Sequence, residues 1–212
     1  MRTRSLLAPS LAALLVLGGC TSGEEPLDPT PTETAGTDDS AVTTGVPQGP
    51  TANGYLCRYL GPDQLAALGG GDPAEPLQVD VQDDPTHWVC EARDGEETLA
   101  RVSILLGEDL AAAERETATS AEGVQSGPDY LGESYVSARR VSGLTRCHVP
   151  DGQGSTTWGS YTMVIEALGE SDEDLSKHLL TAAGAAASSL DQAVGCSPKL
   201  ARSEAESATT AP

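Results

Sequence analysis

The feature that most constrains the fold is a short pattern, Cys-x-x-x-Asp-Gly, which occurs twice, beginning at Cys90 and at Cys147. Each copy is followed by a run with many apolar and β-branched residues, at 98–106 and at 157–168, and then by Gly-Glu and an acidic segment that contains Asp-Leu. Asp-Gly between two such runs is typical of a β-hairpin, because glycine tolerates the positive φ of a tight turn. The sequence therefore predicts two units, each a strand, a turn, a strand and a helix.

The clearest predicted helix follows the second hairpin. Ser171 and Asp174 resemble a capping box at its start, and Gly195 and Pro198 end it. Apolar residues recur between them at helical spacing: Leu175, Leu179, Ala182, Ala183, Ala186, Leu190 and Val194. A shorter helix is predicted over residues 62–68, with proline in its first turn. Together these elements predict an α+β domain at 53–198, in which helices pack on one face of an antiparallel sheet.

The first 19 residues have the organisation of a secretion signal. Two arginines precede an apolar run at residues 6–17, which is too short to span a bilayer as a stable helix. The tetrapeptide Leu-Gly-Gly-Cys that ends at Cys20 resembles the bacterial lipobox. This resemblance implies cleavage before Cys20, a diacylglycerol on its sulfur, and a position on the extracytoplasmic face of the cell membrane. A plain secreted protein and an uncleaved anchor are the alternatives.

The segment between Cys20 and the domain is rich in Pro, Thr, Gly, Glu and Asp. Such a composition buries too little apolar surface to offset the entropy lost on ordering. We therefore expect residues 20–52 to form a disordered tether, with an average span of roughly 30 Å by random-coil scaling. Its many threonines leave a glycosylated stalk open. Residues 199–212 are expected to form a second disordered tail.

Four cysteines remain in the predicted domain: Cys57, Cys90, Cys147 and Cys196. In an exported protein an even number of cysteines usually indicates disulfides. A zinc site is the alternative, but the sequence has no Cys-x-x-Cys pair at these positions. Three pairings are possible. We favour Cys57 with Cys90 and Cys147 with Cys196, because each bond then ties a helix to its own hairpin and closes a long loop of the unfolded chain.

Two stretches, LCRYLGPDQLAALGG at 56–70 and HWVCEARDGEETLARVSI at 87–104, are similar to the DUF3558-type lipoproteins of high-GC Gram-positive bacteria. Those proteins also join a lipobox to a domain with a cysteine, a short Leu/Ala helix, and then a Cys-Trp strand and hairpin. In them the Trp usually follows the Cys, whereas here Trp88 precedes Cys90. The resemblance implies an exported, lipid-anchored domain and no particular chemistry.

The residues that carry catalysis in other proteins are scattered here. His87, His148 and His178 have no partner at metal-ligand spacing, and no Gly-x-Ser-x-Gly motif is present. The adjacent acids at 172–174 suit a helix N-terminus better than acid/base chemistry. We therefore expect no catalytic site, no metal and no cofactor.

The formal net charge of −20 excludes nucleic acid as a natural partner, because the field of the protein repels polyanions. We expect a membrane-anchored lipoprotein whose non-catalytic domain binds a small ligand, a cell-wall component or another exported protein. An envelope enzyme with an unrecognised active site is the alternative. A deep apolar pocket between sheet and helix would favour ligand binding, whereas a cleft that gathers histidines and carboxylates would favour the enzyme.

Overall fold

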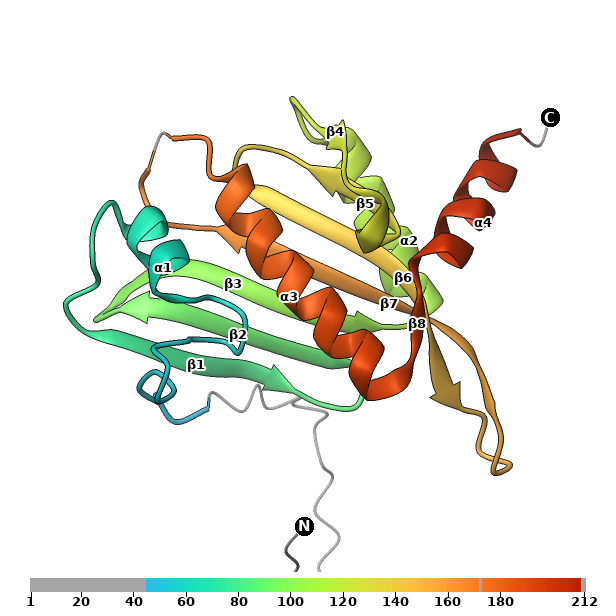
Figure 1. Cartoon of the computed structure of the whole chain (residues 1–212), viewed down its shortest axis with the longest axis horizontal. Helices are drawn as coiled ribbons and strands as arrows, with labels where there is room; N and C mark the ends of the chain where they lie inside the picture. The colour runs from blue at the N-terminus through green and yellow to red at the C-terminus, as the bar shows by residue number, and fades with distance from the viewer. Residues whose placement is uncertain (1–44, 172, 211–212) are drawn as a thin grey trace, which may run out of the picture. The chain divides into compact units, whose positions relative to one another are not determined.

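One antiparallel sheet of eight strands forms the frame of the structure (Figure 1). This computed structural model describes residues 45–171 and 173–210. The predicted signal peptide, the lipidation site at Cys20 and residues 20–44 of the predicted tether therefore lie outside the described residues. Within the described part, the predicted α+β class with an antiparallel sheet and two disulfides is confirmed.

The helices and strands follow one another in an order that contains the predicted unit twice. In chain order they are α1 (Pro62–Gly69), β1 (Pro76–Asp83), β2 (His87–Asp94), β3 (Glu97–Leu106), α2 (Glu108–Ser120), β4 (Gln125–Ser126), the 3-10 helix η1 (Asp129–Leu131), β5 (Glu133–Val136), β6 (Arg140–Pro150), β7 (Thr156–Ala167), α3 (Ser176–Val194), β8 (Cys196–Ser197) and α4 (Pro198–Thr210). The series β2, β3, α2 and the series β6, β7, α3 are the two units, so both predicted hairpins are confirmed.

The two hairpins lie side by side at the centre of the sheet (Figure 1). The strand order is β1-β2-β3-β7-β6-β5-β4, and β8 pairs with β6 beyond the end of β5. Strand β3 pairs with β7 from Ala100↔Ala167 to Leu106↔Tyr161. The two units are therefore joined through the second strand of each hairpin, which makes one continuous sheet out of two local ones.

The hydrophobic core lies between α1, α3 and one face of the sheet, here called the α3 face. Its largest buried side chains come from all three parts: Leu65, Leu68, Leu99, Met163, Ile165 and Leu179. The chain contains no Phe, and leucines and alanines make up most of this core. The buried positions of α3 are one leucine and three alanines, and such small side chains let a helix lie close to a sheet.

Helix α2 packs on the opposite side of the sheet, here called the α2 face, and Figure 1 shows it behind the strands. Successive side chains of a strand point to opposite faces, so Glu166 lies opposite the core residue Ile165. Arg140 joins Glu166 to Glu114 of α2, which places α2 on the face of Glu166. The prediction that helices pack on one face is therefore right for α1 and α3 and wrong for α2.

The start of α3 differs from its prediction. The helix begins at Ser176, and Asp174 Oδ1 accepts a hydrogen bond from the Ser176 N–H at 2.9 Å. The predicted start at Ser171 is wrong because Arg139 holds the preceding segment in another conformation. Its guanidinium donates to the carbonyl oxygens of Ala167, Gly169 and Ser171. These contacts come from a distant part of the chain, so the local capping pattern could not reveal them.

The predicted C-terminal tail is helical from Pro198 to Thr210, so the expectation of a disordered tail is wrong for these residues. Proline suits the first turn of a helix, because it has no N–H to leave unpaired there. Two ion pairs then hold α4 to the rest of the domain, Arg146 with Glu204 and Arg202 with Asp129, each at 2.6 Å. Ala201 is its buried residue. The sequence showed no large apolar stripe here, and α4 instead packs through small residues and charges.

The predicted tether ends earlier than expected, because residues 45–52 belong to the described structure and residues 45–48 lie along β1. The Gly45 N–H donates to the Asp80 carbonyl at 2.8 Å. Gln48 and Gln78 exchange two backbone hydrogen bonds, at 2.9 and 2.7 Å. A strand edge exposes unpaired backbone groups, and this segment satisfies some of those of β1. Residues 45–48 therefore pack on the sheet, although they lie outside the predicted bounds of the domain at 53–198.

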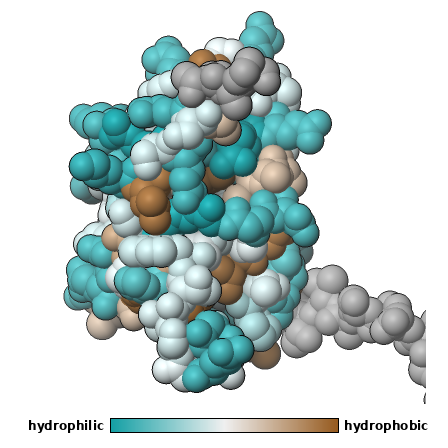
Figure 2. All heavy atoms as spheres, turned by 90° about the vertical axis from the view of Figure 1, so that its right-hand side faces the viewer, coloured by the Kyte–Doolittle hydropathy of each residue, from teal (hydrophilic) through white to brown (hydrophobic). Residues whose placement is uncertain are grey.

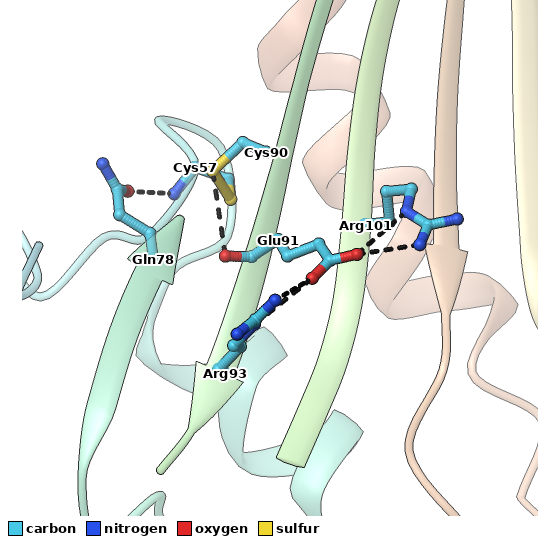
Figure 3. Close-up of a disulfide and its surroundings, with 6 residues drawn as sticks. All are labelled: Cys57, Gln78, Cys90, Glu91, Arg93 and Arg101. Carbon is cyan, nitrogen blue, oxygen red and sulfur yellow. Dashed lines mark hydrogen bonds and ion pairs between the residues drawn. A yellow bond between two sulfur atoms is a disulfide. The ribbon is translucent and has the colours of Figure 1, made fainter. Parts of the chain in front are cut away.

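Both predicted disulfides are confirmed. Cys57 is bonded to Cys90 with a Cα–Cα distance of 5.6 Å, and Cys147 to Cys196 with a distance of 4.0 Å. In Figure 3 the first bond joins the loop before α1 to strand β2, and the Cys57 N–H donates to Gln78 Oε1 at 2.5 Å. The second bond joins β6 to the chain that leaves α3. Each bond thus ties a helix to its hairpin.

Candidate functional site

A pocket of about 280 Å³ lies between α3 and the sheet, and we call it the α3 pocket. Its walls come from η1, β6, β7, α3, β8 and the start of α4: Tyr130, Leu131, Thr145, Met163, Gly184, Ala187, Ser188, Asp191, Cys196 and Pro198. Most of these residues are apolar or small. Figure 2 looks onto the side of the domain that carries α4, and it shows hydrophobic surface in recesses between hydrophilic ridges.

Small residues on α3 create the space. Gly184, Ala187, Ser188 and Asp191 share one side of the helix, because they are spaced by three or four residues. A methyl group on Gly184 would lie 3.5 Å from the Tyr130 ring, which is ordinary contact. A longer side chain here or at Ala187 would therefore enter the pocket. The pocket exists because this stripe of α3 carries glycine, alanine, serine and aspartate, which are too small to fill the space.

The second disulfide holds one wall of the pocket. Cys196 lines it and is bonded to Cys147 of β6. Asp191 reinforces the turn between α3 and β8, since its carbonyl accepts from the Gly195 N–H at 2.8 Å and its carboxylate accepts from the Cys196 N–H at 2.9 Å. The wall is therefore fixed covalently and by hydrogen bonds before any ligand arrives.

Helix η1 forms the other wall. Leu131 is buried, whereas the side chain of Tyr130 is 53% exposed. Asp129 is held by Arg202 of α4, and Gly132, with φ +84°, lets the chain pass so close to the Leu144 carbonyl that a Cβ atom would lie 2.1 Å from it. This fixed turn leaves the Tyr130 ring at the mouth of the pocket with one side open to solvent.

One polar group in the pocket wall lacks a hydrogen-bond partner. Thr145 is 5% exposed, and no described group lies within hydrogen-bonding reach of its Oγ1 atom. Strand alternation places it on the α3 face with Val141 and Cys147. Burying a hydroxyl without a partner costs about 1–3 kcal/mol. Ser142 and Thr162 also have unpartnered hydroxyls, but neither lines the α3 pocket.

The α2 face carries a second hollow, of about 530 Å³, between α2, α4 and the sheet, and we call it the arginine basin. Arg146 pairs there with Glu108 and Glu204, and the Ser160 hydroxyl donates to Glu108 at 2.8 Å. Burial alone would raise the pKa of Glu108, but the hydrogen bonds from Arg146 and Ser160 outweigh burial and hold that pKa below its ordinary value. Glu108 is therefore an ionised, paired group.

Glu133 has the same character in the basin. Burial acts to raise its pKa, yet a bidentate ion pair from Arg115, with both distances at 2.7 Å, and a hydrogen bond from Tyr135 lower it. Burial and the bond to Glu133 raise the pKa of Tyr135 to about 12. Neither group is poised to exchange a proton near neutral pH. The basin is held together by its own ion pairs.

A row of alternating charges crosses the α2 face beside this basin. Glu91, Arg101, Glu166 and Arg140 stand opposite one another on β2, β3, β7 and β6. Glu91 also pairs with Arg93, and Figure 3 shows its carboxylate between Arg93 and Arg101, at 2.6 and 2.8 Å. The sequence contains these charged residues at scattered positions, and only the strand register places opposite charges next to one another. In the observed register, opposite charges therefore face one another across both hairpins.

The three histidines do not converge. His87 contacts the Thr86 hydroxyl at 2.9 Å, and His178 lies half-buried on α3. His148 stacks on Trp158 in the projecting β6–β7 hairpin, with ring centroids 4.0 Å apart. Within residues 45–171 and 173–210, no group of three or more His, Cys, Asp or Glu side chains could hold a metal ion. The described helices also include none that is long and apolar enough to cross a membrane.

Sequence reasoning missed the residues of the α3 pocket. Thr145, Tyr130 and Gly184 come from three separate elements, and none carries a motif. The one available signal was the run of small residues in TAAGAAASS at 181–189, which indicated a stripe of α3 that cannot fill space. A comparison with protein-family models, curated proteins and solved structures finds no match for the chain. The resemblance to DUF3558-type lipoproteins stays an expectation.

Proposed function

We propose that this protein is an exported lipoprotein, anchored to the extracytoplasmic face of the cell membrane through Cys20, whose domain binds a small, mainly apolar ligand in the α3 pocket. The anchor rests on the lipobox-like tetrapeptide before Cys20 and on the apolar run that precedes it. Two acyl chains on one residue would hold the domain stably, since one chain alone binds a membrane only marginally.

The observation that carries the binding function is the α3 pocket itself. Ligand sites are typically concave, mainly apolar, and equipped with few polar groups. The α3 pocket has this composition, with the unpartnered Thr145 hydroxyl in its wall. Its volume of about 280 Å³ lies near the lower end of the usual range, which begins at about 300 Å³. The ligand is accordingly small, of the size of one ring with a short substituent.

Electrostatics disfavour an anionic ligand. The pocket lining includes Asp191 at the exposed end and no Lys, Arg or His. The net charge of −20 adds a long-range field of the same sign. The alternative of an envelope enzyme is less well supported, because the carboxylates of the arginine basin are paired with arginines and no histidine lines either hollow.

The binding function can be tested with fluorobenzene as a probe, observed by ¹⁹F NMR, on the full chain carrying Cys20→Ala so that no detergent competes. We expect the free probe signal to broaden with the wild-type pocket. Ala187→Leu should abolish the broadening, because the added side chain occupies the pocket. Ala185→Leu is the matched control, since Ala185 is exposed on the same helix. No broadening in the unsubstituted domain, or broadening that survives Ala187→Leu, would contradict the proposal.

The anchor has a separate test. In cells, Cys20→Ala should move the protein from the membrane fraction into the medium, or leave an uncleaved precursor, because the acceptor for the lipid is gone. Fractionation and intact mass spectrometry measure both outcomes. A lipid-bearing, detergent-extracted protein that is unchanged by the substitution would refute the anchor and would leave the ligand pocket unaffected.

A further inference from the structure

The buried hydroxyl of Thr145 restricts what the pocket can bind. Threonine Oγ1 can donate one hydrogen bond and accept others, and here it does neither with any described group. Rotation about χ1 moves Oγ1 from one staggered position to another, so the hydroxyl can turn toward the α3 pocket, one of the two hollows that Thr145 lines. A ligand group that reaches this hydroxyl forms a hydrogen bond with it. The bond also removes the free-energy cost of the unpartnered hydroxyl in the ligand-free protein.

The groups around Thr145 favour a flat, aromatic partner. Met163 lies in the inner wall and is 1% exposed, and Tyr130 stands at the mouth. A thioether contacts the edge of an aromatic ring favourably, and two aromatic rings attract one another in offset or edge-to-face arrangements. Gly184 adds no side chain of its own and the Tyr130 ring lies beside it, so a ring in the pocket would meet Tyr130 next to α3.

The charge of the ligand follows from the lining. Asp191 is the ionisable side chain of the pocket, and a buried carboxylate on the ligand would find no cation to pair with. The ligand group that bonds to Thr145 must also leave water for an apolar pocket. A neutral hydroxyl costs less free energy to desolvate than a charged group does. One such group is enough, because Thr145 Oγ1 is the one buried hydroxyl of the described pocket wall that lacks a hydrogen-bond partner.

We propose that the ligand of the α3 pocket is a small neutral aromatic molecule with one hydroxyl group, of phenol type, and that this hydroxyl bonds to Thr145 Oγ1. This inference rests on the proposed ligand-binding function and adds the chemical class of the ligand. Thr145 is then the residue that determines specificity, while Met163, Tyr130 and Gly184 shape the space for the ring.

Titrations with four probes test it: phenol, fluorobenzene, cyclohexanol and benzoate, measured by NMR on the full chain carrying Cys20→Ala. We expect phenol to bind most tightly, with benzoate and cyclohexanol at least tenfold weaker. Thr145→Val keeps the shape of the side chain and removes the hydroxyl, so it should weaken phenol about tenfold, the equivalent of about 1.4 kcal/mol, and leave fluorobenzene unchanged. Thr145→Ser, which keeps the hydroxyl, should retain the preference for phenol.

Thr157→Val is the matched control, because Thr157 is exposed on β7 and lies outside the pocket. It should leave all four affinities unchanged. If fluorobenzene binds but Thr145→Val does not affect phenol, the ligand class is overturned and the binding function stands. Equal affinities for cyclohexanol and phenol overturn the proposed preference for an aromatic ligand. Equal affinities for benzoate and phenol overturn the proposed preference for a neutral ligand. If no probe binds, both the inference and the proposed function fail.

Discussion

The two hairpin–helix units of this protein have the same order of elements and put their helices on opposite faces of one sheet. In the first unit α2 packs on the polar α2 face, and its buried positions are Ala111, Glu114 and Ala118. In the second unit α3 packs on the apolar α3 face, and its buried positions are a leucine and three alanines. A shared local pattern therefore produces a hairpin and a helix but leaves open which face the helix covers.

The difference between the units explains where the pocket lies. On the α2 face, ion pairs such as Arg140 with Glu114 span the space between helix and sheet. Long charged side chains fill that space and satisfy one another. On the α3 face the helix packs on the sheet through apolar side chains, and the space stays empty where its stripe contains Gly184 and Ala187. An apolar interface built from small residues is the condition for a ligand pocket here.

The largest expected effect concerns the helix contacts themselves. Leu179→Ala on α3 should lower the free energy of unfolding by about 3 kcal/mol, because it leaves a cavity in the core. Leu110→Ala on α2 should cost about 1 kcal/mol or less, because Leu110 is half-exposed. Urea unfolding of both variants measures the contrast. Equal losses would show that the two helices contribute alike and would break the comparison.

A smaller effect is expected from the charged contact of α2. Glu114 is 6% exposed and pairs with Arg140 at 2.5 Å. Glu114→Gln should cost about 2 kcal/mol, because the charge-assisted hydrogen bonds from Arg140 are lost. Glu116→Gln, at an exposed position of the same helix, serves as the control and should stay within about 0.5 kcal/mol of the unsubstituted chain. If Glu114→Gln leaves the free energy of unfolding unchanged, the buried alanines of α2 hold the helix instead of the ion pair.

Lowering the pH should weaken the ion pairs of the α2 face, including those of Glu91. Hydrogen bonds and charges from Arg101 and Arg93 outweigh burial and lower the pKa of Glu91 from its ordinary value of 4.5. A lowered pKa contributes stability above the ordinary value, and that contribution is lost as pH falls through the folded-state pKa. Glu91→Gln should therefore be less stable at pH 7, and its stability curve should approach that of the unsubstituted chain as the pH falls below about 4.5. Parallel curves would contradict this role of Glu91.

The smallest expected effect concerns strand β1, at the outer edge of the sheet beside the first unit. Residues 45–48 cover this edge. Gln48→Pro removes the N–H that donates to the Gln78 carbonyl at 2.9 Å, and it should cost about 0.5 kcal/mol. Gln48→Ala keeps this N–H and should be neutral. Thermal unfolding of both variants separates the backbone bond from the side chain. A loss of equal size in both would assign the effect to the side chain.

Much of the fold could be predicted because its signals are local. The Asp-Gly turns, the spacing of apolar residues in α3 and the positions of the four cysteines each depend on residues near one another in the chain or on a simple pairing argument. The start of α3, the existence of α4 and the side on which α2 packs depend instead on Arg139, Arg146 and Arg140. Each of these arginines meets partners more than twenty residues away, so no local pattern contains the information.

The candidate site shows the same division more sharply. The amino-acid sequence alone specified two hairpins, their helices and both disulfides, because turn chemistry, side-chain periodicity and loop closure act along the chain. The α3 pocket was decided only when η1, β6, β7, α3, β8 and the start of α4 came together. A cavity is the volume that packed side chains leave empty, and a buried hydroxyl such as that of Thr145 is unpartnered only with respect to all its neighbours in space. Neither property belongs to any single segment of the chain.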